Sequence, residues 1–143
     1  MPTSFSICLW HQNAKEMAAY YQEIFKDFKL LSENPMASVF EMNGIRMMCL
    51  NNAVPNVSFN EKISFVLTVD TQEEIDYYWN RFALDGKEGQ CGWIKDKYGV
   101  SWQVVPSILG KLMTNPETAP KATYAFMQMS KFDIAKLEEA VVK

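Results

Sequence analysis

Residues 63–83, ISFVLTVDTQEEIDYYWNRFA, decide the fold because a strand, a helix cap and an amphipathic helix follow one another within them. The β-branched and aromatic residues at 63–68 are typical of a strand. Thr71 and Glu74 have the spacing of a capping box, in which the threonine side chain accepts a hydrogen bond from the first helical turn. Apolar residues then recur at helical spacing, namely Ile75, Tyr78, Trp79, Phe82 and Ala83. This segment therefore predicts a strand followed by a helix that packs on a sheet.

The same arrangement occurs earlier in the chain, so the sequence contains an internal repeat. Residues 5–10, FSICLW, align with 63–68, and the box that begins at Asn13 and ends at Glu16 aligns with the later capping box. The helix expected after Asn13 carries an equivalent apolar stripe, formed by Met17, Tyr20, Tyr21, Ile24 and Phe25. Two modules of similar fold are therefore predicted.

Each copy continues with an antiparallel meander. In the first copy a strand at 37–42 enters the pair Asn43-Gly44, which strongly favours a two-residue turn, and a β-prone run follows up to residue 50. In the second copy 93–95 precede a turn in which Asp96 is interpreted as the turn former, and the last strand follows Gly99. Each module is thus predicted as strand, helix and meander.

The repeat divides one predicted domain, residues 1–143, into parts of different character. Module one covers 4–51 and module two covers 62–106. Residues 52–61, which contain Pro55 and several asparagines, are predicted to be the linker between the modules.

A helical extension is predicted at 107–143, outside the repeat. Ser107 is expected to cap its first helix, a second helix is expected from near Pro120 to Met129, and a third is expected after a cap within 130–133. The extension carries apolar residues that one small module cannot cover, which favours packing against a second copy of the chain.

Composition excludes several classes of function. The chain has 14 basic and 17 acidic residues without a basic cluster, so a nucleic-acid partner is not expected. No apolar run is long enough to span a membrane, so no membrane association is expected either. The three cysteines, Cys8, Cys49 and Cys91, lack metal-ligand spacing, which favours reduced thiols and a cytoplasmic location. His11 is the single histidine, which limits imidazole chemistry.

Alternation along the strands separates two faces of each predicted sheet. One set is uniformly apolar and is expected under the two helices: Phe5, Ile7, Leu9, Ile63, Phe65, Leu67 and Val69. The opposite set mixes small polar and apolar groups: Ser6, Cys8, Trp10, Ser64, Val66, Thr68, Ser101, Gln103 and Val105. A mixed face of this kind suits a ligand cleft between the repeated sheets, while the alternative is an ordinary solvated sheet face.

The closing segment identifies a family resemblance. Residues 90–106, QCGWIKDKYGVSWQVVP, are similar to the closing motif of the PhnB-like branch of the vicinal oxygen chelate, or glyoxalase, superfamily, a branch often described as 3-demethylubiquinone-9 3-methyltransferase-like. Residues 127–138, MQMSKFDIAKLE, resemble its C-terminal segment. The resemblance implies a glyoxalase-like α+β fold, in which two βαβββ modules form a curved mixed sheet and C-terminal helices follow. It also implies a homodimer.

In metal-dependent members of that superfamily, ligands lie on the first and last strands of each module. The matching positions here are Ser6, Met48, Ser64 and Gln103. Two hydroxyls, a thioether and a neutral amide bring no charge to a divalent metal, so no metal is expected. No glycine-rich loop joins a strand to a helix, so no adenosyl cofactor is expected and the methyltransferase activity in the branch name is not favoured.

Several residues have both a functional and a structural interpretation. His11 is either a proton shuttle or a loop residue, Cys91 is either a reactive thiol or an inert one, and Glu41 is either a general base or a solvated carboxylate. Trp10 and Trp93 either stack on a ligand or belong to the core. Gln103, as a long amide within a β-branched strand, either joins a polar network with Ser6 and Ser64 or binds a ligand.

Two functions follow from these observations. The first is a metal-independent binding protein that holds a small apolar or aromatic molecule in the cleft, with no catalytic residue assigned. The second is an enzyme of lyase, isomerase or dioxygenase type that uses an unrecognised metal or cofactor. The residues predicted to line the cleft are Ser6, Cys8, Trp10, Met48, Ser64, Val66, Trp93 and Gln103.

Overall fold

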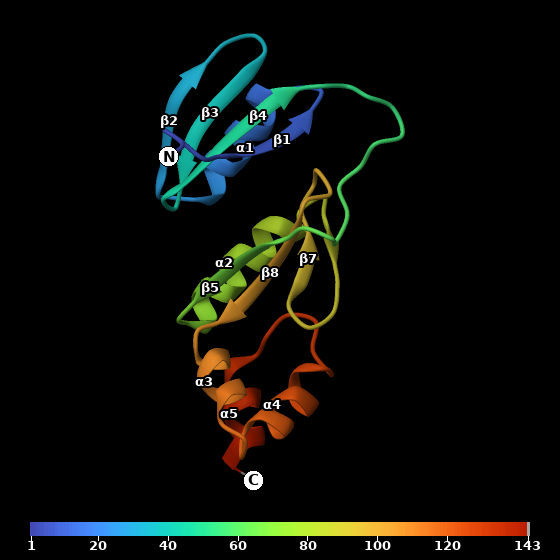
Figure 1. The fold of residues 1–143 in the computed structure, drawn as a ribbon. Helices are drawn as coiled ribbons and strands as arrows, with labels where there is room; N and C mark the ends of the chain where they lie inside the picture. The colour runs from blue at the N-terminus through green and yellow to red at the C-terminus, as the bar shows by residue number, and fades with distance from the viewer. Residues whose placement is uncertain (143) are drawn as a thin grey trace. The chain divides into compact units, whose positions relative to one another are not determined.

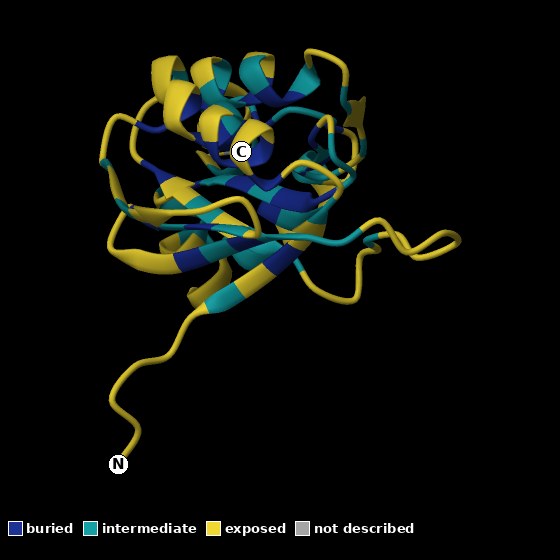
Figure 2. Cartoon of the chain, turned by 90° about the horizontal axis from the view of Figure 1, so that it is seen from above, coloured by how far each residue is buried: buried dark blue, intermediate teal, exposed yellow. Residues whose placement is uncertain are grey.

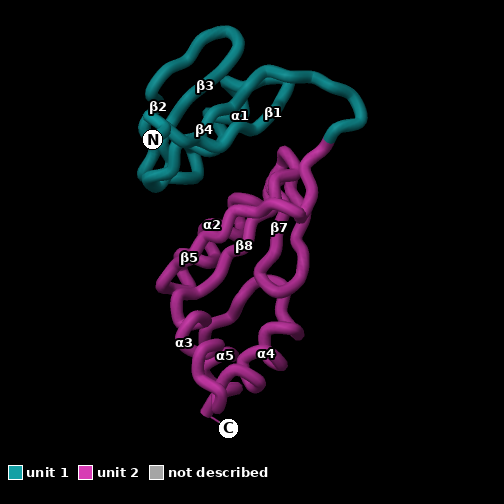
Figure 3. Tube along the Cα trace, viewed as in Figure 1, with its two compact units in different colours: residues 1–57 teal, residues 58–143 magenta. Residues whose placement is uncertain are grey.

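A computed structural model describes residues 1–142 and divides the chain into two compact units, Met1–Val57 and Ser58–Lys143 (Figure 3). The boundary between the units falls within residues 52–61, the segment predicted to be a linker. Each unit has its own four-stranded sheet with one helix packed on it (Figure 1).

The first unit contains β1 (Ile7–His11), α1 (Ala14–Ile24), β2 (Phe28–Glu33), β3 (Ala37–Met42) and β4 (Ile45–Asn51). Its strand order is β1-β4-β3-β2, with β1 parallel to β4 and the other neighbours antiparallel. A parallel pair needs a crossover connection, and α1 together with the β2–β3 hairpin forms that connection.

The sequence signals of the first unit act locally as predicted. The Asn13 side chain caps α1 by accepting from the Glu16 N–H at 3.1 Å. Asn43 has φ of 53°, as a tight turn between twisted strands requires, and it joins β3 to β4. The buried core joins one stripe of α1 to one face of the sheet and includes Met17, Tyr21, Ile24, Phe40, Met47 and Cys49.

The second unit repeats this order with β5 (Phe65–Val69), α2 (Gln72–Ala83), β6 (Lys87–Glu88), β7 (Trp93–Lys95) and β8 (Ser101–Pro106). Its strand order is β5-β8-β7-β6, with β5 parallel to β8 and the other neighbours antiparallel. The two sheets therefore share one topology, which confirms the predicted α+β fold of two βαβββ modules.

Trp102 on β8 organises the core of the second unit. Its ring stacks on Phe82 of α2 with centroids 4.6 Å apart and lies 5.0 Å from the ring of Phe65. The helix starts at Thr71, whose hydroxyl oxygen accepts from the Glu74 N–H at 3.1 Å. The apolar stripe of α2 is thus directed at β8, as the spacing of its residues predicts.

The turn between β7 and β8 depends on Asp96, which is 2% exposed. Its Oδ1 accepts from the backbone N–H groups of Tyr98 at 2.9 Å and Val100 at 3.1 Å. Its Oδ2 accepts from the indole Nε1–H of Trp102 at 2.9 Å. The prediction that Asp96 forms the turn is confirmed, and the same carboxylate also holds the core tryptophan.

Three helices follow the second sheet: α3 (Ile108–Thr114), α4 (Ala119–Phe126) and α5 (Ile134–Val142). Their outward residues are exposed (Figure 2). The segment before α5 is bound to the rest of the unit, since the N–H groups of Cys91 and Gly92 donate to the carbonyls of Met129 and Ser130, each at 2.8 Å. The Gln72 amide at the start of α2 also donates to the Phe132 carbonyl at 2.9 Å.

Some boundaries differ from the sequence prediction. Phe5 and Ile63 are 88% and 65% exposed, because strand pairing begins two residues later and neither residue lies under a helix. Ser107 makes no capping hydrogen bond, because its backbone is already helical and its N–H donates to the Val69 carbonyl at 2.8 Å. The helix expected to reach Met129 ends at Phe126, because residues 129 and 130 pair with the loop before β7.

The predicted cap before the last helix is confirmed, and the structure contains two strands that were not predicted. Asp133 caps α5 by accepting from the Lys136 N–H at 3.1 Å, within the predicted cap at 130–133. The strands β2 and β6 had no residues assigned to them in the sequence analysis. In the part of the chain that the structure describes, no helix is both long and apolar enough to cross a membrane.

Replacing Asp96 by asparagine tests the turn. Either orientation of the amide directs an NH₂ group at an N–H donor, so one buried hydrogen bond is lost at a cost of about 2 kcal/mol. Asp133→Asn is the matched control, because asparagine and aspartate cap helices about equally well. Denaturant unfolding of both variants measures the difference, and equal losses would show that the buried carboxylate has no special role.

A glycine pair tests how the C-terminal segment packs. A Cβ at Gly92, where φ is +83°, would lie 2.4 Å from the Phe132 ring, whereas one at Gly99, where φ is +85°, would meet no atom within 4 Å. Gly99→Ala should cost about 1 kcal/mol for the left-handed backbone alone. Gly92→Ala should cost about 3 kcal/mol, since overpacking adds to that strain. Similar losses in thermal unfolding would place Phe132 away from Gly92.

Candidate functional site

Each sheet has one face covered by its helix and one turned away from it, called the distal face here. In the second unit the register pairs Gln103 with Val66 of β5 and with Trp93 of β7, so these three side chains share a face. The neighbouring Trp102 packs on α2, so this shared face is the distal one. The structure thus brings together three predicted site residues from three different strands.

Gln103 also contacts Ser64, the fourth predicted site residue of this unit. Its Nε2 donates to the Ser64 hydroxyl at 3.1 Å. The polar-network interpretation of Gln103 is therefore correct as far as Ser64 is concerned. The Gln103 side chain remains half-buried, and its amide oxygen accepts no hydrogen bond from any described residue.

A cavity of about 300 Å³ opens beside this group of residues. Its lining includes Glu61, Lys87, Gln90, Trp93, Lys95 and Ser101. Trp93, Lys95 and Ser101 belong to the distal face, because Lys95 pairs with Ser101 two residues along from the Trp93 and Gln103 pair. The volume is at the lower end of ligand pockets, which are typically about 300–1,000 Å³.

The charges around the cavity are partly paired. The Lys95 ammonium forms an ion pair with the exposed Glu61 carboxylate. This hydrogen bond from Lys95 is the main cause that lowers the pKa of Glu61, and the charge of Lys87 contributes to the same lowering. Glu61 is therefore ionised near neutral pH and keeps Lys95 at the rim of the cavity.

Glu88 and Lys87 are adjacent on β6, so their side chains lie on opposite faces of the sheet. The Glu88 carboxylate accepts a hydrogen bond from the indole Nε1–H of Trp79 on α2. Side chains alternate along a strand, so Lys87 extends away from α2 and lies over the cavity. Within residues 1–142 Lys87 forms no ion pair.

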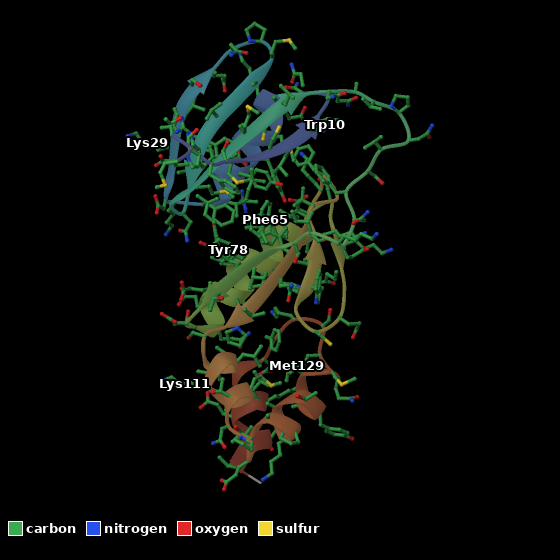
Figure 4. All side chains as sticks on the ribbon, in the orientation of Figure 1. Trp10, Lys29, Phe65, Tyr78, Lys111 and Met129 are labelled. Carbon is green, nitrogen blue, oxygen red and sulfur yellow. The ribbon has the colours of Figure 1, made fainter. Side chains whose placement is uncertain are left out.

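The first unit presents an equivalent distal face. Cys8 pairs with Met48, and Trp10 lies two residues further along β1 (Figure 4). Trp10 is 45% exposed and Cys8 is exposed, so neither belongs to the core. Ser6 precedes β1 and is exposed, one residue outside the pairing that places the others.

The thiols differ in their surroundings. Burial raises the pKa of the Cys49 thiol to about 12, and interaction with Cys8 adds to the shift. Partial burial also raises the pKa of Cys8. All three cysteines are free thiols, and a raised pKa disfavours the nucleophilic thiolate at Cys8 and Cys49.

The superfamily metal does not fit the side chains at the expected positions. Ser6, Met48, Ser64 and Gln103 offer two hydroxyls, a thioether and an amide, and the Ser64 oxygen already accepts from Gln103. Divalent first-row metals prefer imidazole and carboxylate donors. Across the described residues, no three His, Cys, Asp or Glu side chains are grouped where they could hold a metal ion.

The remaining candidates are not among the residues that line the cavity. His11 ends β1, where it pairs with Asn51, and is half-buried. Glu41 lies between Lys29 and Arg46 in the register of the first sheet. Cys91 is in the loop that binds the C-terminal segment, and its φ of 57° is left-handed.

Sequence reasoning placed Ser101 on the mixed face without listing it among the cleft residues, and it did not assign Lys87, Lys95 or Glu61 to the site. Alternation from Trp93 and Gln103 places Lys95 and Ser101 on the same face, so the signal for these two was present. Lys87 could not be found in this way, because β6 has only two residues and no recognisable pattern. Glu61 lies in the predicted linker, and only folding brings it to Lys95.

Solved structures share this architecture. A PhnB protein from Bacillus cereus, described as a putative 3-demethylubiquinone-9 3-methyltransferase, is 26% identical with a TM-score of 0.66, and the match covers 73% of this chain and all (100%) of that one. A protein from Pseudomonas aeruginosa is 18% identical with a TM-score of 0.56 over 73% of this chain and 98% of its own.

A fosfomycin resistance protein, FosX, from Listeria monocytogenes is 15% identical with a TM-score of 0.59, over 80% of this chain and 98% of its own. At such identities the likeness to the Pseudomonas and Listeria proteins shows the fold alone. No protein with a curated functional description matches this chain.

The sequence profile of one family matches most of the chain. That profile, the 3-demethylubiquinone-9 3-methyltransferase family, covers residues 3–105, from before β1 to the last strand of the second unit. The chain therefore belongs to this family, the PhnB-like branch of the glyoxalase superfamily, and has the glyoxalase-like fold.

Proposed function

We propose that this protein binds a small apolar or aromatic molecule on the distal face of the second sheet, without a metal. The proposal rests on one observation: Trp93 lines a cavity of about 300 Å³ and pairs with Gln103, which is hydrogen-bonded to Ser64 on the same face. Apolar walls with a few placed polar groups are typical of small-molecule sites. Val66, 60% exposed on the same face, adds apolar surface for the ligand.

The roles of the residues follow from their chemistry. The half-buried Trp93 ring offers a flat surface on which a planar ligand stacks. The Gln103 amide oxygen accepts from a ligand donor, while its NH₂ group stays bound to Ser64. The distal face of the first sheet, with Ser6, Cys8, Trp10 and Met48, is proposed as a second ligand-contacting surface.

Metal independence is part of the proposal. One FosX structure is described as a complex with Mn(II) and sulfate, so a protein of this fold can bind a metal. The side chains at the corresponding positions here are uncharged, which supports binding without one. The competing hypothesis, an enzyme with an unrecognised metal or cofactor, requires donors other than Ser6, Met48, Ser64 and Gln103.

We further propose that the protein is a cytoplasmic homodimer. Apolar residues on the C-terminal helices support a partner surface, since Tyr124 is 75% exposed and Met113 is 40% exposed. Three free thiols support a reducing compartment. Sedimentation equilibrium of the full chain measures the stoichiometry directly.

Elemental analysis tests metal independence. Protein purified from medium supplemented with manganese, iron and zinc should hold well under one metal per chain, because the predicted donors carry no charge. Thermal unfolding should be the same with and without EDTA, since a ligand selective for the folded state would raise its stability. A stoichiometric metal that survives dialysis would favour the enzyme hypothesis.

A thermal-shift screen with Gln103→Ala tests the position of the site. Small aromatic and apolar compounds should raise the unfolding temperature of the original protein. Loss of one neutral hydrogen bond should weaken the best binders about three- to tenfold, corresponding to about 1 kcal/mol.

Gln22→Ala is the matched control, because Gln22 is exposed on α1 in the other unit. Its response should equal that of the original protein. If Gln103→Ala leaves every compound-induced shift unchanged, the ligand binds elsewhere.

A further inference from the structure

Ser101 is the anomaly in this cavity. Its side chain is 2% exposed, and its hydroxyl oxygen has no hydrogen-bond partner among residues 1–142. An unpaired buried hydroxyl destabilises the folded state, so native proteins rarely keep one without a reason. Ser101 lines the cavity, so a bound molecule is placed to supply the missing partner.

The cavity also has a lysine that forms no ion pair among residues 1–142, although its charge acts on Glu61. This residue, Lys87, lines the cavity together with its neighbour Glu88, whose carboxylate already accepts a hydrogen bond from the indole Nε1–H of Trp79 on α2. Lys95 pairs with Ser101 in the register and lines the same cavity, so a second lysine is available to an anion bound there. An anionic group between them would satisfy the hydroxyl and meet both cations.

The Glu61 carboxylate already shows how Lys95 binds an anion. Glu61 is exposed and precedes β5, so its ion pair with Lys95 is at the solvent-facing rim. Exposed ion pairs are weak, so a ligand carboxylate that also reaches Ser101 can compete for Lys95. Glu61 therefore opposes an anionic ligand, and removing its charge should favour one.

Trp93 and the volume of the cavity limit the size and shape of the ligand. Trp93 lines the same cavity and is half-buried, which exposes part of its ring to a bound molecule. A cavity of about 300 Å³ accommodates one ring with a short polar substituent. Aromatic rings gain affinity from stacking beyond the area that they bury, so an aromatic ring is favoured over an aliphatic one.

We propose that this cavity binds a monocyclic aromatic carboxylate, with the ring against Trp93 and the carboxylate at Ser101, Lys87 and Lys95. The inference deepens the proposed function by naming the chemical class of its ligand, and it rests on that function. It assigns Ser101 and Lys87 as the residues that select an anion over a neutral molecule. The Glu61 carboxylate competes with the ligand for Lys95 and therefore lowers the affinity for the ligand.

Calorimetric titration of the full chain with three probes tests this: benzoate, the neutral benzamide and the non-aromatic cyclohexanecarboxylate. Benzoate should bind with a Kd of about 1 mM or tighter, as a ligand of its size allows. Benzamide and cyclohexanecarboxylate should each bind at least fivefold more weakly. Binding of benzoate should weaken further as salt is added, because its charge contacts are partly exposed.

Four variants measure how much individual side chains contribute to the affinity for benzoate. Ser101→Ala should weaken benzoate at least tenfold through loss of a charge-assisted hydrogen bond, and Lys87→Gln should weaken it about threefold. Glu61→Gln should strengthen it about threefold, because Lys95 is released. Lys111→Gln on α3, a lysine outside the cavity (Figure 4), should change nothing.

Ser101→Ala also has a readout that does not depend on binding. Removing a hydroxyl without a partner should leave the unfolding temperature of the free protein equal or higher. Ser38→Ala is the matched buried serine. Its hydroxyl donates to Glu33 at 3.1 Å, so this variant should lower the unfolding temperature. A large loss of stability in Ser101→Ala would mean that Ser101 has a structural partner and would overturn its assignment.

The failures of the two proposals are distinguishable. Equal affinity for benzamide and benzoate would overturn the anionic class while leaving small-molecule binding intact. No benzoate binding at about 10 mM, together with thermal shifts from neutral compounds that respond to Gln103→Ala, would overturn this inference alone. Absence of any stabilising compound would contradict both.

Discussion

The buried carboxylate of Asp96 holds β7 and β8 in a single register. It binds two backbone N–H groups of the turn and the indole of Trp102, so one side chain fixes both the turn and the core. The registers of Lys95 with Ser101 and of Trp93 with Gln103 follow from it. A shift of one residue would move these groups to the α2 side. The candidate site therefore depends on a hydrogen-bonded carboxylate that lies outside it.

The register of β7 and β8 matters for the site because a helix covers only one face of each sheet. In the second unit Trp102 packs against Phe82 of α2 and against Phe65. The alternate residues of the strands therefore face away from the helix and can contact a ligand. The distal face of the second sheet holds a tryptophan, an amide and a hydroxyl, namely Trp93, Gln103 and Ser64. The fold thus supplies an uncovered sheet face with a cavity, while its side chains decide what that face binds.

Local signals predicted most of the fold. Thr71 and Asn13 cap helices as their spacing indicates, and Asn43 turns the hairpin, because these interactions involve neighbours in sequence. Strand ends were less predictable, as Phe5 and Ile63 show, since pairing depends on partner strands distant in sequence. The two-residue strand β6 was not predictable at all, because it has no periodicity of its own.

The sequence by itself determined the repeat, the two amphipathic helices and the face on which Gln103, Ser64, Val66 and Trp93 lie, because alternation and helical spacing are properties of neighbouring residues. Only the tertiary structure decided that Ser101 is buried without a partner, that Lys95 meets Glu61 and that Lys87 lies over the cavity. Burial and ion pairing depend on segments that meet only when the chain folds. The contacts that give the cavity its charge were therefore hidden from the sequence, although alternation along β7 places Lys95 on the face of Trp93.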